Sequence, residues 1–156
     1  MRTIERTSAL AAPAAEVWAA AVTPEGINDE LSPVLRMTVP PRLRGKTIDD
    51  VSAGEALGRS WILLGGVVPV DFDDLCLAEL EPGTRFLERS RTLAFAVWQH
   101  ERIVAPATDG SCLVTDRLGF ELRRGLALVP GGERLAAAIV AALFRHRHRR
   151  LQRRYG

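Results

Sequence analysis

The sequence is poor in the residues that most often carry covalent and metal chemistry. It has two cysteines and three histidines among 156 residues. Cys76 and Cys112 lie in apolar, strand-like segments without the spacing of metal ligands. We therefore expect two small buried side chains rather than a disulfide or reactive thiols. His146 and His148 stand two residues apart in a helical segment, where their side chains point in different directions, so we expect no metal site.

Several sequence signals are also missing. No apolar run reaches the roughly 20 residues of a membrane span, and the first residues lack the apolar stretch of a secretory signal, so we expect a cytoplasmic protein. The glycine pairs at 65–66 and 131–132 lack the context of a Walker or dinucleotide-binding loop. No serine has a nucleophile-elbow setting. We therefore expect no cofactor, and hydrolase chemistry is disfavoured.

The composition is typical of a folded domain. Apolar residues make up 47% of the chain and charged residues 26%, which argues against disorder. A length of 156 residues is enough for one domain with its own core. We expect a single domain over residues 1–156.

Positive charge is concentrated near the C-terminus. The net charge is +2, but six arginines and no acidic residue lie between residues 145 and 154, so the rest of the chain sums to −4. Basic helices can neutralise nucleic-acid phosphates, yet Leu143, Phe144 and Leu151 should tie one face of this helix to the core. We expect a solvated basic face and no nucleic-acid partner, with a membrane surface or an acidic partner as the alternative.

Three consecutive segments, at residues 86–91, 97–104 and 112–120, show the alternation of half-buried strands. Alternate side chains of a strand point to opposite faces. One face is bulkier, more aromatic and more apolar than the other, so we expect it to face the core. Its members are Phe86, Glu88, Ser90, Trp98, His100, Arg102, Val104, Cys112, Val114, Asp116, Leu118 and Phe120.

Charged and titratable residues occur within this core-facing set. They are Glu88, His100, Arg102 and Asp116. A buried charge is costly unless it is paired. These side chains therefore form either a structural ion network or the polar lining of a cavity, and the sequence leaves both open.

The opposite face of the same strands has a simpler interpretation. Arg89, Glu101 and Arg117 alternate in sign across what should be neighbouring antiparallel strands. Opposite charges pair modestly in that position, and exposed pairs contribute only about 0–1 kcal/mol each. We expect a solvated outer face.

The order of elements follows from turn signals and periodicity. Asp109-Gly110 is a strong hairpin signal, and Pro13 suits the first turn of a helix. We predict strands at 2–10, 35–39, 58–64, 74–80, 85–91, 97–104 and 112–120, short helices near 13–23 and 25–31, a loop over 41–57, a break at 124–132 and a long helix at 133–155.

The long C-terminal helix has an apolar stripe. At about 100° per residue its members are Ala136, Ile139, Val140, Leu143, Phe144 and Leu151. Arg147 lies near the centre of that stripe, which places a positive charge against the predicted sheet.

The chain resembles the START-like (SRPBCC) superfamily, which includes polyketide cyclases and dehydrases and lipid-transport domains. The resemblance lies in the strand-to-helix opening at residues 8–18, in Thr23-Pro24-Glu25-Gly26 and in the long terminal helix. More specific stretches, at 58–61, 86–90, 98–102, 115–117 and 144–151, are similar to a bacterial branch without an assigned function. The resemblance implies an α+β, helix-grip fold, with a cavity between a curved sheet and the terminal helix.

The leading hypothesis is a binding module for a small hydrophobic or amphipathic molecule, because the fold alone does not fix an activity. The candidate ligand-binding residues are Trp61, Phe86, Glu88, Ser90, Trp98, His100, Arg102, Asp116, Phe120 and Arg147. The enzyme alternative is a cofactor-independent cyclase or dehydratase in which His100 is a general acid or base oriented by Glu88 or Asp116. A third alternative is a structural or regulatory domain with a filled cavity. The oligomeric state is left open between monomer and homodimer.

Overall fold

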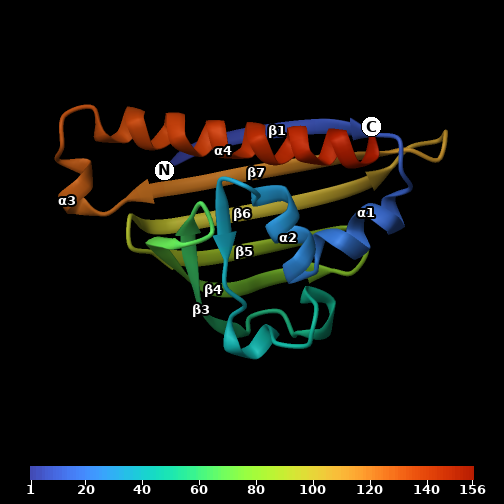
Figure 1. The fold of residues 1–156 in the computed structure, drawn as a ribbon, viewed down its shortest axis with the longest axis horizontal. Helices are drawn as coiled ribbons and strands as arrows, with labels where there is room; N and C mark the ends of the chain where they lie inside the picture. Colours follow the sequence, from blue (N-terminus) through green and yellow to red (C-terminus); the bar gives the residue numbers. More distant parts are fainter.

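Seven strands form one antiparallel sheet, which curves beside a long C-terminal helix (Figure 1). The computed structural model describes residues 1–156. The strands are β1 (Arg2–Leu10), β2 (Leu35–Met37), β3 (Ala56–Leu64), β4 (Val68–Glu81), β5 (Arg85–Thr92), β6 (Phe95–Pro106) and β7 (Cys112–Leu122). The helices are α1 (Ala14–Ala21), α2 (Pro24–Leu31), α3 (Arg124–Ala127) and α4 (Gly132–Tyr155), with 3-10 turns η1 (Pro41–Leu43) and η2 (Ile48–Asp50).

The strand order across the sheet is β1-β7-β6-β5-β4-β3-β2. Strands β2 to β7 are consecutive antiparallel neighbours, and β1 pairs with β7 along its whole length. α4 contacts both β1 and α2, so the C-terminal end of the chain packs against its N-terminal part. This arrangement confirms the α+β, helix-grip architecture predicted from the sequence.

The predicted inward and outward faces of β5, β6 and β7 are confirmed. In the register, Arg102 lies opposite Asp116, and His100 lies opposite Glu88. Ten of the twelve residues expected to face the core are buried, and the other two, Glu88 and Trp98, are partly buried. Alternation therefore assigned the faces of these strands correctly.

Two tight turns connect the longer strands. Gly110 has a φ of +83°, as the predicted Asp109-Gly110 hairpin between β6 and β7 requires. At the β3–β4 turn Gly65 and Gly66 also have positive φ, and Leu64 pairs directly with Val68 beyond them. β4 therefore begins six residues before the predicted strand at 74, because this turn brings the start of β4 back along β3.

The predicted loop at 41–57 contains the two 3-10 turns and the first residues of β3, and β2 ends at Met37 rather than at residue 39. The side chain of Thr38 is the reason for the early end, since its Oγ1 accepts a hydrogen bond from the Trp61 N–H at 2.8 Å. A side-chain bond there replaces one of the backbone bonds that would extend the strand.

The orientation of α4 differs from the predicted stripe. Ile139, a predicted member of the stripe, is 59% exposed, and His148, which is not among the predicted members, is fully buried. The buried residues of α4 are Val140, Phe144, Arg147, His148, Leu151 and Tyr155. The buried face is centred on the Arg147–His148 side because both of these side chains bond to groups of the core.

The basic face of α4 is only partly solvated. Arg147 is buried, while Arg150 and Arg154 reach Asp29 of α2 at 3.1 and 3.4 Å. The arginines that remain exposed without an ion pair are Arg145, Arg149 and Arg153. The expectation of a solvated face is therefore wrong for Arg147, whereas Arg150 and Arg154 keep exposed surface while they pair with α2.

The apolar core has two unequal parts. The large cluster has 15 buried residues and the small cluster has four: Leu118, Phe120, Val140 and Phe144. Along β7, Asp116 separates Val114 of the large cluster from Leu118 of the small cluster. α4 repeats this order, with Arg147 and His148 between its contributions to the two clusters. A polar layer therefore crosses the core.

Candidate functional site

Seven polar side chains, which we call the buried polar layer, lie between the two apolar clusters. They come from five elements: β1, α2, β6, β7 and α4. None of them is more than 7% exposed. The members are Ser8, Glu30, His100, Arg102, Asp116, Arg147 and His148.

Arg102 is the centre of the buried polar layer. Its Nε and Nη2 donate to Asp116 Oδ1 and Oδ2 at 2.8 and 2.7 Å. Its Nη1 and Nη2 donate to Glu30 Oε1 and Oε2 at 2.6 and 2.9 Å. The planar guanidinium thus forms forked pairs with two carboxylates, the geometry in which arginine binds carboxylates most strongly.

The second cation of the layer comes from α4. Arg147 Nε donates to Glu30 Oε2 at 2.9 Å. Next to it, His148 Nε2 donates to Asp116 Oδ2 at 2.9 Å, and His148 Nδ1 lies 2.7 Å from Ser8 Oγ. Two successive residues of α4 therefore reach opposite sides of the layer and fix the rotation of the helix.

His100 completes the layer from β6. Its Nε2 donates to Asp116 Oδ1 at 2.8 Å, and its Nδ1 lies 3.9 Å from Glu88 Oε2. Phe86 and Phe144 stand edge-on to the imidazole, with ring centroids 5.5 and 5.1 Å away. The ring is thus held in one orientation by Asp116 and by the two aromatic side chains.

The electrostatics of the layer favour the ionised carboxylates. Burial by itself raises the pKa of Asp116, but Arg102 and His100 hold that pKa well below its ordinary value. Burial also opposes ionisation of Glu30, and Arg102 and Arg147 lower its pKa. For Arg102, burial is outweighed by Asp116 and Glu30, so its pKa is raised well above the ordinary value.

The structure joins four of the predicted site residues in this layer: His100, Arg102, Asp116 and Arg147. It adds three that were not predicted: Ser8, Glu30 and His148. A signal existed for the last two. Glu30 lies four residues after Gly26 and three after Ile27, both on the inward side of α2, and His148 lies four after Phe144.

A second polar group lies on the inner face of β4 and β5. We call Asp73 and Glu88 the acid pair. Glu88 Oε1 accepts from Ser90 Oγ at 2.8 Å, whereas the Oδ1 atom of Asp73, a residue only 4% exposed, has no hydrogen-bond partner. Burial, followed by the nearby Glu88, raises the pKa of Asp73 well above its ordinary value.

Aromatic side chains border the small apolar cluster. Phe95 packs against Trp98 and Phe120, with centroids 5.3 and 5.5 Å apart, and Trp98 lies 6.5 Å from Phe144. Phe95 and Trp98 remain only partly buried. The inner face therefore keeps accessible aromatic surface next to the acid pair.

Trp61 lies apart from the other candidates. It is 45% exposed, while the preceding Ser60 is fully buried, so the two side chains point to opposite faces of β3. Trp61 packs edge-on against Phe72 at 5.9 Å, and Arg59 stacks over Phe72 at 3.7 Å. The structure therefore places Trp61 on the outer face of the sheet.

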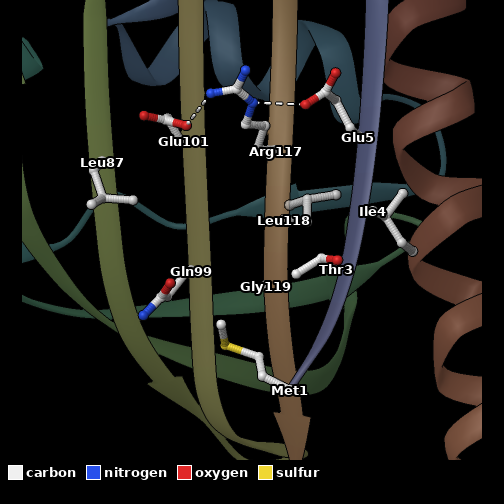
Figure 2. A pocket seen from close by; sticks show the side chains of 10 residues that line it. All are labelled: Met1, Thr3, Ile4, Glu5, Leu87, Gln99, Glu101, Arg117, Leu118 and Gly119. Carbon is white, nitrogen blue, oxygen red and sulfur yellow. Dashed lines mark hydrogen bonds and ion pairs between the residues drawn. The ribbon is translucent and has the colours of Figure 1, made fainter.

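The outer face carries a shallow groove of about 350 Å³ (Figure 2). Arg117 crosses it, with ion pairs to Glu5 at 2.7 Å and to Glu101 at 3.4 Å. The Met1 side chain covers Gly119 at the other end. The predicted pairing of Glu101 with Arg117 on an outer face is confirmed, and the groove is on the side of the sheet opposite to the buried polar layer.

Three further findings concern the whole chain. No group of three or more His, Cys, Asp and Glu side chains is arranged to hold a metal ion. Cys76 and Cys112 are free; Cys112 is buried in the large apolar cluster, as expected, whereas Cys76 is only partly buried. None of the helices combines the length and apolar composition needed to cross a bilayer.

The same fold occurs in solved structures of low sequence identity. A START superfamily protein from Mycobacterium smegmatis is 13% identical with a TM-score of 0.70, over 98% of this chain and 96% of that one. The Zhui aromatase/cyclase from Streptomyces sp. R1128 is 15% identical with a TM-score of 0.70, over 97% and 91%. Protein CV1439 from Chromobacterium violaceum is 18% identical with a TM-score of 0.70, over 99% and 98%.

These likenesses show that the chain has a START-like fold, in agreement with the resemblance seen in the sequence. No curated protein matches the sequence. A family model described as a domain of unknown function (DUF8410) matches residues 8–155, and the chain belongs to that family.

Proposed function

We propose that this protein binds a small amphipathic molecule between the inner face of the sheet and the N-terminal half of α4. The observation that carries the proposal is the unequal core. The small cluster has four buried residues but five partly buried apolar neighbours: Ile4, Phe95, Trp98, Ala137 and Leu143. Partly buried apolar surface beside a few polar groups is typical of ligand sites.

Each end of the ligand has a matching surface in this proposal. The apolar part packs against Trp98, Phe120 and Leu143, and the polar part meets Glu88, Ser90 and His100. Support comes from the fold shared with the START superfamily protein and the aromatase/cyclase, since the superfamily that the sequence resembles includes lipid-transport domains and cyclases.

The remaining predicted site residues have a different role in this proposal. Arg102, Asp116 and Arg147 bond to protein groups, and Asp73 Oδ1 is the one buried side-chain polar atom that lacks a partner. We assign these three residues to holding α2 and α4 on the sheet. The structural network and the polar lining, which the sequence left as alternatives, thus coexist at neighbouring places.

A cyclase or dehydratase activity is the second candidate, and the surroundings of His100 favour it. The imidazole lies between Asp116, which accepts from Nε2, and Glu88, whose side chain is 13% exposed. An oriented imidazole beside a carboxyl group suits proton transfer. Under this alternative His100→Gln abolishes turnover and leaves ligand binding intact, whereas under the binding proposal it changes affinity alone.

The cytoplasmic location of the protein stays a prediction.

The test is native mass spectrometry of the freshly purified protein, followed by denaturing extraction of the adduct. We expect a hydrophobic adduct of defined mass. Trp98→Ala should reduce the fraction of protein carrying it, because Trp98 borders the proposed site. Trp61→Ala is the matched control, since it removes an indole from the outer face and should leave that fraction unchanged.

An unliganded mass for the wild type would support the filled-cavity alternative if added fatty amines and alcohols also failed to bind. Equal loss of adduct in the two tryptophan variants would place the molecule elsewhere on the protein.

A further inference from the structure

We propose that the acid pair, Asp73 and Glu88, binds a cationic hydrogen-bond-donating group of the ligand, such as a protonated amine. This inference rests on the proposed function, because it names the chemistry of the polar end of the same site. Its basis is a buried carboxylate oxygen, Asp73 Oδ1, that accepts no hydrogen bond from a protein donor.

The register of the sheet places Asp73 on the inner face. It lies opposite Ser60 on one side and Thr92 on the other, and all three are buried. Asp73 Oδ1 has no hydrogen-bond partner. Buried polar atoms of proteins almost always have one, so an atom in this position next to partly buried aromatic side chains indicates a place for a ligand donor.

Glu88 adds a second acceptor to the same place. Ser90 Oγ donates to its Oε1 at 2.8 Å, and its Oε2 faces His100 Nδ1 at 3.9 Å, beyond hydrogen-bonding distance. Glu88 therefore retains acceptor capacity on the side of the inner face where Trp98 is only partly buried.

The charged groups near the acid pair include one arginine, Arg123, which donates to the backbone carbonyl of Thr92 rather than to a carboxylate of the pair. From β4, Asp71 faces the same region, with its Oδ1 accepting from the Phe72 and Leu93 N–H groups. From β6, His100 is the only titratable base in contact, and no arginine or lysine forms an ion pair with Asp73 or Glu88. Ser60 and Thr92, from β3 and β5, are neutral.

The buried polar layer gives an internal comparison. Asp116 and Glu30 are buried, as Asp73 is. Each of them bonds to Arg102 and to at least one further basic side chain. The acid pair has no such arginine. A carboxyl pair without a counter-cation favours a ligand that supplies one, because a desolvated charge is stabilised mainly by an opposite charge.

The proton on the acid pair determines whether binding of a cation releases a proton to the buffer. Burial and the neighbouring Glu88 raise the pKa of Asp73 well above its ordinary value, so Asp73 holds a proton more readily than an exposed carboxyl group does. An ammonium group that donates N–H bonds to Asp73 stabilises its ionised form. The proton then leaves Asp73 for the buffer, so binding of one ammonium group releases up to one proton.

The experiment compares three probes with the same chain: decylamine, decanol and decanoate. Their affinities for the full-length protein are measured at pH 7 by isothermal titration calorimetry in two buffers of different ionisation enthalpy. We expect decylammonium to bind at least tenfold more tightly than decanol and decanoate to bind weakest. The buffer dependence should show proton release with decylammonium alone.

Asp73→Asn should reduce the preference for the amine over the alcohol to less than threefold, with decanol affinity within about twofold of wild type. Glu88→Gln should have the same effect and serves if the first variant does not fold. Asp74→Asn is the matched control, because Asp74 pairs with Arg59 on the outer face at 2.7 Å, and it should retain the full preference.

The outcomes separate the two proposals. Binding of decanol and decylammonium with equal affinity, or a preference that survives both Asp73→Asn and Glu88→Gln, overturns the inference and leaves the proposed function standing. Failure of all three probes to bind the wild type overturns both.

Discussion

Arg102 shows what a single buried residue contributes to this protein. It is 1% exposed and donates four hydrogen bonds, two to Asp116 and two to Glu30. The two carboxylates come from β7 and α2, so one guanidinium joins the sheet to a helix. The same side chain brings two negative charges into the core, and these are tolerable only while it is present.

We expect Arg102→Met to destabilise the protein by about 3–5 kcal/mol, because removal of one partner leaves buried charges uncompensated. Urea unfolding followed by circular dichroism measures the change. Arg59→Met on the outer face is the control; its ion pair with Asp74 is exposed and should contribute no more than about 1 kcal/mol. A loss for Arg102→Met as small as that of the control would contradict the central role of Arg102.

Helix α2 is the element on which the buried polar layer depends most. It carries Glu30 to Arg102 and Arg147, and its Asp29 pairs with Arg150 and Arg154 of α4. Its position against α1 depends on a glycine, since a Cβ on Gly26 would lie 1.8 Å from the carbonyl oxygen of Ala20. The close packing of α1 and α2 thus determines the position of the Glu30 carboxylate.

Gly26→Ala should cost about 1–3 kcal/mol in the free energy of unfolding, as overpacking does in well-packed cores, because α2 must move away from α1. Gly125→Ala in α3 is the control: it meets nothing within 4 Å and should change stability by no more than about 0.5 kcal/mol. Thermal unfolding of the two variants tests this, and equal midpoints would show that α2 tolerates the shift.

At the scale of the whole molecule, the buried carboxylates determine the response to acid. The folded-state pKa values of Glu30 and Asp116 lie below their ordinary values of 4.5 and 3.8. Their contribution to stability is present above those ordinary values and is lost as the pH falls through the folded-state pKa values. Asp73 acts in the opposite direction, because its pKa is raised and ionisation at higher pH opposes folding.

The free energy of unfolding should therefore fall steeply below about pH 4.5, with little loss between about pH 7 and 5. Urea unfolding at a series of pH values measures it. In Asp73→Asn the stability at pH 7 should exceed that of the wild type, and this difference should shrink as the pH falls. A wild-type stability that rises steadily down to pH 3 would contradict the ionised state of Glu30 and Asp116.

Local patterns in the sequence predicted most of the architecture. Alternation assigned the inner faces of β5, β6 and β7, Asp109-Gly110 located a hairpin, and helical periodicity located α4. These predictions succeed because strand and helix periods and turn conformations depend on residues close together in the chain. The presence of charges among core-facing residues such as His100 and Asp116 follows from the same alternation.

What the sequence did not determine are the partners of those charges. Glu30 and Arg102 are 72 residues apart, and His148 and Asp116 are 32 apart. Which carboxylate meets which cation depends on how α2 and α4 pack on the sheet, and so does the rotation of α4 that buries His148 and exposes Ile139. The unpaired oxygen of Asp73 also appears only in the folded structure, because whether a buried atom has a partner is a property of its neighbours in space.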